Sequence, residues 1–240
     1  MIKRIRFATR RRDVAPGAFA AAWPAAVAAV AQAPAGVRPA RVAVCTTLAE
    51  LTGPGAKHDG IGFEWFADAG HLARFESWLH TAEGRSSLAA LAAVAAAGAS
   101  PVIVADECVL RGAGWLGQRW RDGGDKLKHM AIALRAAGLS AAEFSERWRH
   151  HAGRVGGPGG APATVIPEGA RGLAYVQDHP RPRPAGDDWA YDALNEVWFD
   201  DVEGLRDRIA WFRENVPADG DDGLVRRSWF VAAREQVVLA

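Results

Sequence analysis

The two halves of the chain carry the same residue pattern, and this repetition constrains the fold more than any other feature of the sequence. Residues 2–23 align with residues 127–148 without a gap, at an offset of 125. The offset rises to 133 where the second half has a Gly- and Pro-rich stretch, and falls to 128 where the first half has an Ala-rich one. Insertions confined to loop-like stretches are expected of two copies of one domain. The paired residues include Lys3/Lys128, Arg10/Arg135, Phe19/Phe144, Trp23/Trp148, Asp59/Asp192, Trp65/Trp198, Asp68/Asp201, Leu72/Leu205, Trp78/Trp211 and Glu107/Glu235.

The repetition divides the chain into two domains and a linker. We expect domains over residues 1–111 and 126–240, the first being the more divergent copy, and a linker over residues 112–125 whose Trp115 and Trp120 dock on the surface. A chain of 240 residues is long enough for two cores of this size. The basic N-terminus would on its own suit a secretory signal. Because it has a counterpart in mid-chain, we expect it to be part of the fold.

Charge and composition exclude several classes of partner. The chain has 29 Lys and Arg against 28 Asp and Glu, and a net charge of +1 gives no bulk attraction to nucleic acid or to an anionic membrane. The uncharged stretch over residues 86–105 is mainly Ala, Ser and Gly and contains Pro101, which argues against a membrane span. Two cysteines are too few for a disulfide scaffold or a cysteine-built zinc site. We therefore expect a soluble cytoplasmic protein with no nucleic-acid and no membrane partner.

Hydrophobic periodicity predicts a β-α-β-β-α-β order in each half. Ser140 and Glu143 form a capping box at the start of one helix, and Asp201 is expected to cap another. In the first half we expect strands over residues 2–9, 41–47, 59–66 and 102–110, and helices over residues 16–33, 70–80 and 86–97. In the second half we expect strands over residues 126–135, 172–179, 190–199 and 226–238, and helices over residues 140–151 and 202–215.

This order is that of the ferredoxin-like fold, an α+β arrangement with helices on one face of a sheet ordered 4-1-3-2. One half alone would leave its other sheet face exposed, so we expect the two sheets to pack against each other. The predicted architecture is a pair of ferredoxin-like βαββαβ repeats forming an intrachain pseudo-dimeric α/β barrel, either as a monomer or as a homodimer of the whole chain. Cys45 and Cys108 would lie on opposite edges of one sheet, which disfavours a disulfide between them.

Three segments of the second half carry a resemblance to a known family. They are Phe144-x3-Trp148, Tyr175-Val-Gln-Asp-His179 and Tyr191-Asp192-x5-Trp198-Phe199-Asp200-Asp201. Over nearly the whole second half they resemble an EthD-type domain of the dimeric α/β-barrel superfamily, and the first half resembles it more weakly. The resemblance implies two sheets that face each other across a cavity. Related barrels include cofactor-free monooxygenases, lactone isomerases, polyketide cyclases and haem enzymes, so the resemblance leaves the reaction open.

One position departs from the family pattern. EthD-type helices often carry a histidine four residues after the tryptophan, and this chain has Ala152 there. The first half supplies no histidine at the corresponding places either. We therefore expect a single site, built mainly from the second half.

Alternation along the strands predicts which side chains face the cavity. In the first strand of each half, apolar residues such as Ile5, Phe7, Met130 and Ile132 are assigned to the helix-packed face. Arg4 and Arg6 would then face the cavity and pair with Asp59 or Glu196. The residues assigned to the cavity face are Arg4, Arg6, His129, Tyr175, Gln177, His179, Asp192, Glu196, Trp198 and Trp65.

These residues suggest a cofactor-independent enzyme acting on a small apolar or aromatic molecule. His179 would be the acid/base, Tyr175 would hold a carbonyl oxygen, and Glu196 would orient the histidine. The reaction would be a proton transfer (isomerisation, cyclisation or dehydration) or an oxygenation. The sequence contains no phosphate-loop, zinc-protease or facial-triad motif, so no metal and no cofactor are expected. The residues expected to contact the substrate are His129, Gln177, Asp192, Trp198, His151, Arg4, Arg6 and Trp65.

Two alternatives use the same cavity. The first is a non-catalytic carrier or accessory protein that binds a small molecule there. The second is an enzyme that binds haem through a histidine, for which a coloured protein would be the simplest sign.

Overall fold

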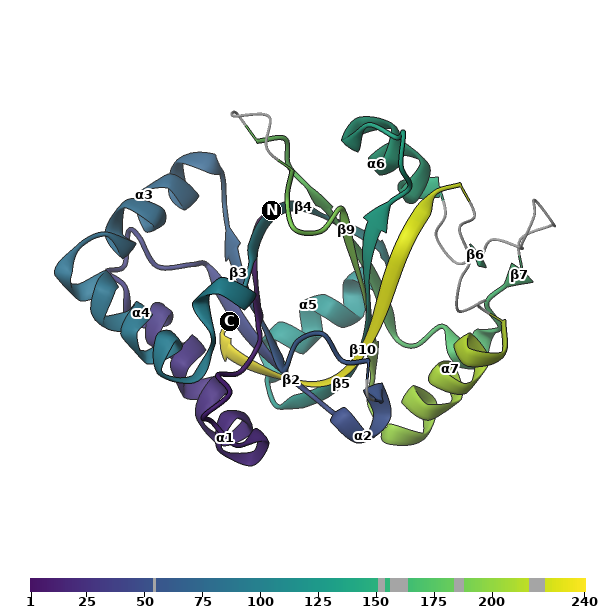
Figure 1. The fold of residues 1–240 in the computed structure, drawn as a ribbon, viewed down its shortest axis with the longest axis horizontal. Helices are drawn as coiled ribbons and strands as arrows, with labels where there is room; N and C mark the ends of the chain where they lie inside the picture. Colours follow the sequence, from purple (N-terminus) through teal and green to yellow (C-terminus); the bar gives the residue numbers. More distant parts are fainter. Residues whose placement is uncertain (54, 151–153, 156–163, 184–187, 216–222) are drawn as a thin grey trace.

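An antiparallel β-barrel with eight strands forms the centre of the part of the chain that the structure describes (Figure 1). The computed structural model describes residues 1–240 except 54, 151–153, 156–163, 184–187 and 216–222. The barrel strands are β1 (Ile2–Ala8), β2 (Arg41–Thr47), β3 (Gly60–Phe66), β4 (Val102–Arg111), β5 (Asp125–Arg135), β8 (Ala174–Pro180), β9 (Ala193–Phe199) and β10 (Val225–Leu239). A separate short pair is formed by β6 (Arg154–Val155) and β7 (Thr164–Val165).

Each half of the chain supplies a block of four neighbouring strands to the barrel. The first block is ordered β4-β1-β3-β2 and the second β10-β5-β9-β8, which is the predicted 4-1-3-2 order in both cases. Two seams join the blocks: β2 pairs with β10, with Thr47 opposite Ala233, and β4 pairs with β8, with Asp106 opposite His179. The predicted α+β class and barrel are confirmed. The sheets that were expected only to face each other are hydrogen-bonded edge to edge.

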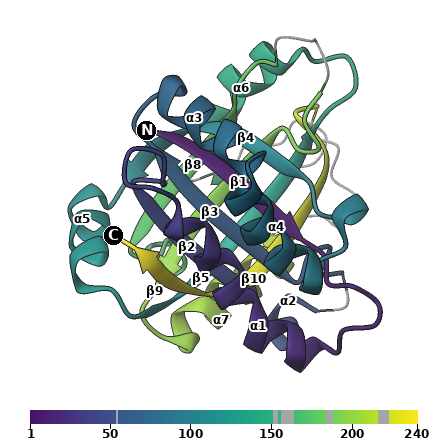
Figure 2. The ribbon, with the colours of Figure 1, turned by 90° about the vertical axis from the view of Figure 1, so that its left-hand side faces the viewer.

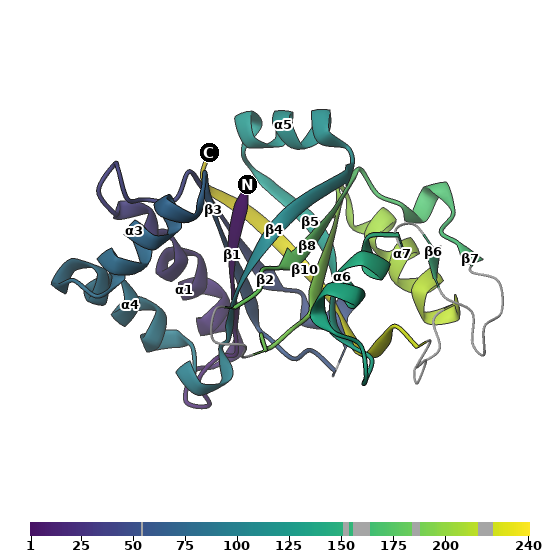
Figure 3. The ribbon, with the colours of Figure 1, turned by 90° about the horizontal axis from the view of Figure 1, so that it is seen from above.

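Helices cover the barrel on two opposite sides (Figures 1 and 3). Helices α1, α3 and α4 lie together on one side, which Figure 2 shows face on, and α6 and α7 lie on the other. No helix in the described part of the chain is both long enough and apolar enough to cross a membrane. The helices are α1 (Pro16–Ala28), α2 (Ala49–Thr52), α3 (Ala69–Leu79), α4 (Ala82–Val94), α5 (Ala113–Asp122), α6 (Ala141–His150) and α7 (Val202–Asn215).

The predicted caps position α6 and α7. At α6 the Glu143 backbone N–H donates to Ser140 Oγ over 3.2 Å, and the Ser140 N–H donates to the Glu143 carboxylate over 2.9 Å. At α7 the Gly204 N–H donates to Asp201 Oδ1 over 2.8 Å. These bonds satisfy N–H groups that have no partner within the helix. Both predicted caps are confirmed.

Residues 113–122 of the expected linker form α5, which crosses one end of the barrel close to both chain termini (Figure 3). Its two tryptophans contact the paired tryptophans of the barrel. The Trp120 ring lies 4.9 Å from that of Trp65 and the Trp115 ring 6.3 Å from that of Trp198, centroid to centroid. This helix therefore closes one barrel end.

The face assignment of the first strand in each half is wrong. Ile5 and Phe7, with Met130 and Ile132 from β5, pack inside the barrel. Arg4 lies on the helix side, where its guanidinium is 2.6 Å from the Glu64 carboxylate and stacks on Phe75 of α3. A closed barrel covered by helices buries both faces of its strands, so an apolar residue does not mark the helix side. Arg4 consequently pairs with Glu64 and not with Asp59 or Glu196.

Candidate functional site

A network of buried charges occupies the barrel end beneath α5. Lys3 and Lys128 enter the interior from β1 and β5, and Glu196 from β9 lies between their ammonium groups. The Glu196 carboxylate is 2.6 Å from Lys3 Nζ and 2.5 Å from Lys128 Nζ. All three side chains have no exposed surface. Burial opposes the charge of Glu196, but Lys128 and Lys3 lower its pKa to about 2.

Each lysine belongs to a Lys-Glu-Trp set built from residues that the two halves share. In the first set Glu107 lies 2.7 Å from Lys3 Nζ and accepts a hydrogen bond from Trp65 Nε1 over 2.7 Å. The second set has the same contacts, with Glu235 pairing with Lys128 and accepting from Trp198 Nε1 over 2.9 Å. Arg119 of α5 adds a third cation, 3.3 Å from Glu235.

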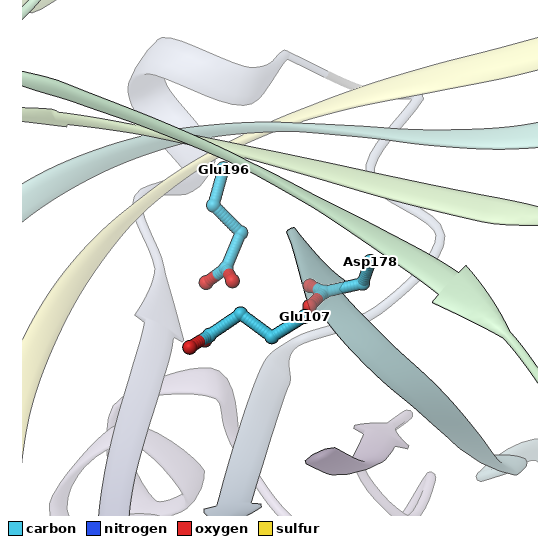
Figure 4. Close-up of side chains that lie close together, drawn as sticks. All are labelled: Glu107, Asp178 and Glu196. Atoms are coloured by element: carbon cyan, nitrogen blue, oxygen red, sulfur yellow. The ribbon is translucent and has the colours of Figure 1, made fainter. Parts of the chain in front are cut away.

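Three carboxylates of this network gather around one point (Figure 4). Glu107, Asp178 and Glu196 each offer an oxygen atom within 4.8 Å of the others, a spacing that a metal ion can use. The Lys3 ammonium lies between them, 2.8 Å from Asp178 as well as close to the two glutamates. The cluster thus already contains a cation of the chain itself. Burial raises the pKa of Asp178 well above its usual range, and Glu196 and Glu107 add to this effect while Lys3 opposes it.

The opposite end of the barrel carries a hydrogen-bonded histidine and tyrosine. His58 precedes β3 and Tyr191 precedes β9, and His58 Nε2 lies 2.5 Å from the Tyr191 hydroxyl. Both residues are buried, with 3% and 1% of their surfaces exposed. The edge of the Tyr191 ring rests against Phe7, with centroids 4.6 Å apart. Two groups that can exchange a proton are thus held together out of water.

The contacts of Thr9 fix the direction of this hydrogen bond. Thr9 Oγ1 lies 3.0 Å from His58 Nδ1, 2.9 Å from the Ala99 carbonyl and 3.3 Å from the Lys57 carbonyl. We assign the single hydroxyl proton to the Ala99 carbonyl, which is the nearest of the three and can only accept. Thr9 must then accept from Nδ1–H, which leaves the Nε2 lone pair facing Tyr191. The Tyr191 hydroxyl therefore donates to His58.

The surroundings keep both groups uncharged. Burial, with a smaller effect from the nearby Lys57 ammonium, lowers the pKa of His58 to about 4. Burial raises the pKa of Tyr191 to about 12. At neutral pH the pair is a free imidazole base and a protonated phenol.

Aromatic rings and cations lie above the pair. The Trp229 ring is 5.9 Å from Tyr191, and Lys57 Nζ lies 4.1 Å above Trp229 and 4.9 Å above Tyr191. Trp229 is half-buried and Lys57 is exposed, so these residues connect the buried pair to the surface. We call His58, Tyr191, Lys57 and Trp229 the mouth cluster.

Four residues predicted to face the cavity face the helices instead. His179 Nδ1 lies 2.9 Å from Ser145 Oγ of α6, and Gln177 Nε2 donates to the Trp148 carbonyl over 2.9 Å. Tyr175 packs against the cluster that includes Leu205 of α7. His129 accepts from Arg208 of α7 over 3.0 Å. The predicted placement is wrong because the interior positions go to Asp178 in β8 and to Lys128 and Met130 in β5, and alternation sends their neighbours outwards.

The other predicted residues are divided among three places. Glu196, Trp65 and Trp198 lie on the predicted interior face, but Glu196 contacts Lys3 and Lys128 and does not orient His179. Asp192 lies beside the mouth cluster, where it pairs with Arg135, and the matching Asp59 pairs with Arg10. Arg6 follows Arg4 to the helix side, and burial with the nearby Arg4 lowers its pKa to about 10. His151 lies outside the described residues.

The mouth cluster was missed at the sequence level although the sequence contains a signal for it. The offset of 133 that pairs Asp59 with Asp192 also pairs His58 with Tyr191, one residue earlier. The expectation of a single site rested on finding no second histidine in the first half. It did not take into account that two different residue types can meet at matching positions. Lys57 and Trp229 carry no such signal, since their proximity depends on barrel closure.

Comparisons with known proteins give structural likenesses only. No protein-family model matches the chain, and no curated protein matches it. The fold is similar to that of a putative monooxygenase from Lactobacillus acidophilus NCFM, with 11% identity over 98% of this chain and 94% of that chain and a TM-score of 0.48. It is also similar to that of a mutant chlorite dismutase from Candidatus Nitrospira defluvii, with 10% identity over 96% and 90% of the two chains and a TM-score of 0.37.

Proposed function

We propose that the chain is a cofactor-independent enzyme that moves a proton on a small apolar or aromatic molecule at the mouth cluster. The observation that carries this proposal is the 2.5 Å contact between the buried His58 imidazole and the Tyr191 hydroxyl. General acid–base catalysis requires such groups within hydrogen-bond reach of the reacting atoms of the substrate, and we place the substrate beside the Tyr191 hydroxyl. Among the reactions considered from the sequence, this geometry favours proton transfer.

The geometry supports a relay in which the proton returns to a different atom of the substrate. The Tyr191 oxygen takes a proton from a C–H or O–H group of the substrate as its own proton passes to His58 Nε2. The reverse step delivers a proton from Tyr191 to another atom of the substrate and restores both groups. The net reaction is an isomerisation that consumes and releases nothing. The low pKa of His58 opposes the first step and favours the second, in which the imidazolium gives up its proton.

Deuterium exchange tests this proposal without knowledge of the natural substrate. 2-Indanone is a small neutral aromatic ketone with exchangeable α-protons, and NMR follows its uptake of deuterium from D2O. We expect the chain to accelerate the exchange, and His58→Asn and Tyr191→Phe each to reduce the enzymatic rate by about 100-fold or more. His80→Asn, an exposed histidine far from the mouth cluster in sequence, is the matched control and should keep the rate.

Other results would contradict the proposal in distinct ways. Binding of 2-indanone without any enzymatic exchange would favour the carrier alternative. Loss of exchange in His179→Asn, with full activity in His58→Asn, would return the catalytic role to His179, where the sequence had suggested it.

We also propose that the chain arose by duplication of a βαββαβ unit related to EthD-type domains, with domains 1–111 and 126–240 around a linker at 112–125. The two Lys-Glu-Trp sets support this origin, because residues aligned by sequence make the same contacts. We further propose that the protein is cytoplasmic and acts either as a monomer that is its own pseudo-dimer or as a homodimer of the whole chain.

A further inference from the structure

We infer that the substrate of the mouth cluster is an aromatic anion whose carboxylate binds between Lys57 and Arg227 while its ring packs on Trp229. This inference rests on the function proposed above and adds the chemical class of the substrate. The observation behind the inference is that Lys57 and Arg227 lie over the Trp229 ring and have no carboxylate partner among the described residues.

Two cations flank one tryptophan at the barrel mouth. Lys57 Nζ lies 4.1 Å from the Trp229 ring centre, and the Arg227 guanidinium carbon lies 4.8 Å from it. A third cation, Arg183, lies 4.7 Å from the centre of the Trp189 ring. Both tryptophans are half-buried and pack against the barrel core, whereas the three cations are exposed. The charges are therefore held over apolar surface at the entrance.

Three carboxylates that adjoin mouth residues in the sequence are already engaged. Asp59 pairs with Arg10, and both Asp192 and Asp188 pair with Arg135. Within the part of the chain that the structure describes, no carboxylate forms an ion pair with Lys57, Arg183 or Arg227. Lys57 and Arg227 also repel each other. The pKa of Lys57 is lowered, first by its partial burial and second by the charge of Arg227. An anion between them would relieve that repulsion.

The rings define the rest of the ligand. A flat aromatic molecule can pack against Trp229 beside the two cations and extend towards Tyr191, whose ring lies 5.9 Å away. With its carboxylate on the cations, such a molecule directs its apolar part at the His58–Tyr191 pair. The cations thus orient the reacting end inwards, and a neutral molecule would lack this constraint.

Calorimetric titration of the full chain with two matched probes tests the inference. The probes are 2-naphthoate and the neutral 2-naphthamide, which share ring and size. We expect naphthoate to bind about tenfold more tightly at low salt, and added NaCl to reduce that preference. The double variant Lys57→Gln/Arg227→Gln should bind the two probes about equally. Lys57→Arg should keep most of the preference, and Arg226→Gln, an exposed arginine of the same strand, should keep all of it.

Three results would overturn the inference: equal binding of both probes by the unaltered chain, no binding of naphthoate, or a preference that survives in the double variant. The salt dependence of the unaltered chain remains decisive even if the double variant does not fold. The proposed reaction is judged separately. In the double variant His58→Asn/Tyr191→Phe the preference for naphthoate should remain. The binding result and the deuterium-exchange result can therefore differ, and each tests only its own proposal.

Discussion

Asp178 shows how a buried charge network accommodates an unequal number of acids and bases. Four interior carboxylates, including Asp178, face Lys3, Lys128 and Arg119. The raised pKa of Asp178 favours its protonated form, which would leave three negative charges opposite three positive ones. The aligned positions of the first half hold Cys45 and Phe63 instead of Asp178 and Glu196, so the surplus acid belongs to one half only.

We predict opposite effects for two substitutions in this network. Asp178→Asn keeps the shape of the protonated acid and should stabilise the protein at pH 7 by about 1 kcal/mol. The raised pKa sets the pH dependence: above pH ~4 the unfolded chain releases the Asp178 proton while the folded chain retains it, so the unaltered protein loses stability as pH rises. The gain from Asn should therefore be near zero at pH ~4 and grow towards neutrality. Lys3→Met leaves buried carboxylates unpaired and should cost about 3 kcal/mol.

Urea unfolding at several pH values measures both effects. A destabilised Asp178→Asn variant at pH 7 would mean that Asp178 is ionised in the folded protein and paired with Lys3.

At the residue scale, strand alternation assigned some side chains correctly to the barrel interior and assigned others to the wrong face of their strand. It placed Glu196, Trp65 and Trp198 correctly, because the third strands keep their large residues on the barrel side. It reversed β1, where Lys3 shares the interior face with Ile5 and Phe7. A lysine at that position can be interior only because Glu107, Asp178 and Glu196 come from strands distant in sequence, and alternation carries no information about them.

At the scale of elements, the contact of α1 with β3 depends on a missing side chain. Trp23 of α1 lies over Gly60 and donates from Nε1 to the Cys45 carbonyl over 3.0 Å. A Cβ at Gly60 would lie 2.4 Å from Trp23 Nε1, whereas one at Gly62 would lie 3.4 Å from its nearest neighbour, a methyl of Val27.

We predict that Gly60→Ala displaces Trp23 and destabilises the protein by about 2–3 kcal/mol. Gly62→Ala is the matched control in the same strand and should change stability by less than about 1 kcal/mol. Thermal unfolding of the two variants makes the comparison. Equal stability of the Gly60→Ala and Gly62→Ala variants would contradict the prediction, because it would mean that α1 can shift away from the sheet without a loss of stability.

Most element boundaries could be predicted from the sequence, and the main omission has a physical cause. The strand over residues 41–47 and the helix over residues 202–215 coincide with β2 and α7. Helix α5 was expected only as a linker, because Gly114 and Gly117 lower its intrinsic helix propensity. Its stabilising contacts are made by Trp115 and Trp120 with the barrel, and such tertiary contacts leave no local pattern.

For the molecule as a whole, the two seams join both halves into one sheet. β10 pairs with β2 of the first half and with β5 of the second, and the α5 tryptophans contact barrel strands of both. Neither half has a complete barrel interior, since Glu196 of the second half also binds Lys3 of the first.

We therefore predict that the chain unfolds in urea as one cooperative unit. Far-ultraviolet circular dichroism and tryptophan fluorescence should give superimposable transitions, and Gly60→Ala should shift both to lower urea together. Two separate transitions, with only the first moved by that substitution, would mean that the halves unfold independently.

The meeting of His58 with Tyr191 has a consequence for how such a centre can evolve. In a two-fold assembly of identical polypeptides, any position that meets its equivalent meets a copy of itself, so every change there is made twice. In a single chain this restriction does not apply: a mutation alters one position only, so a base and an acid can occupy positions that the sequence alignment pairs, as His58 and Tyr191 do. A base facing an acid at equivalent positions of the barrel entrance is thus possible in a single chain and impossible in a homodimer.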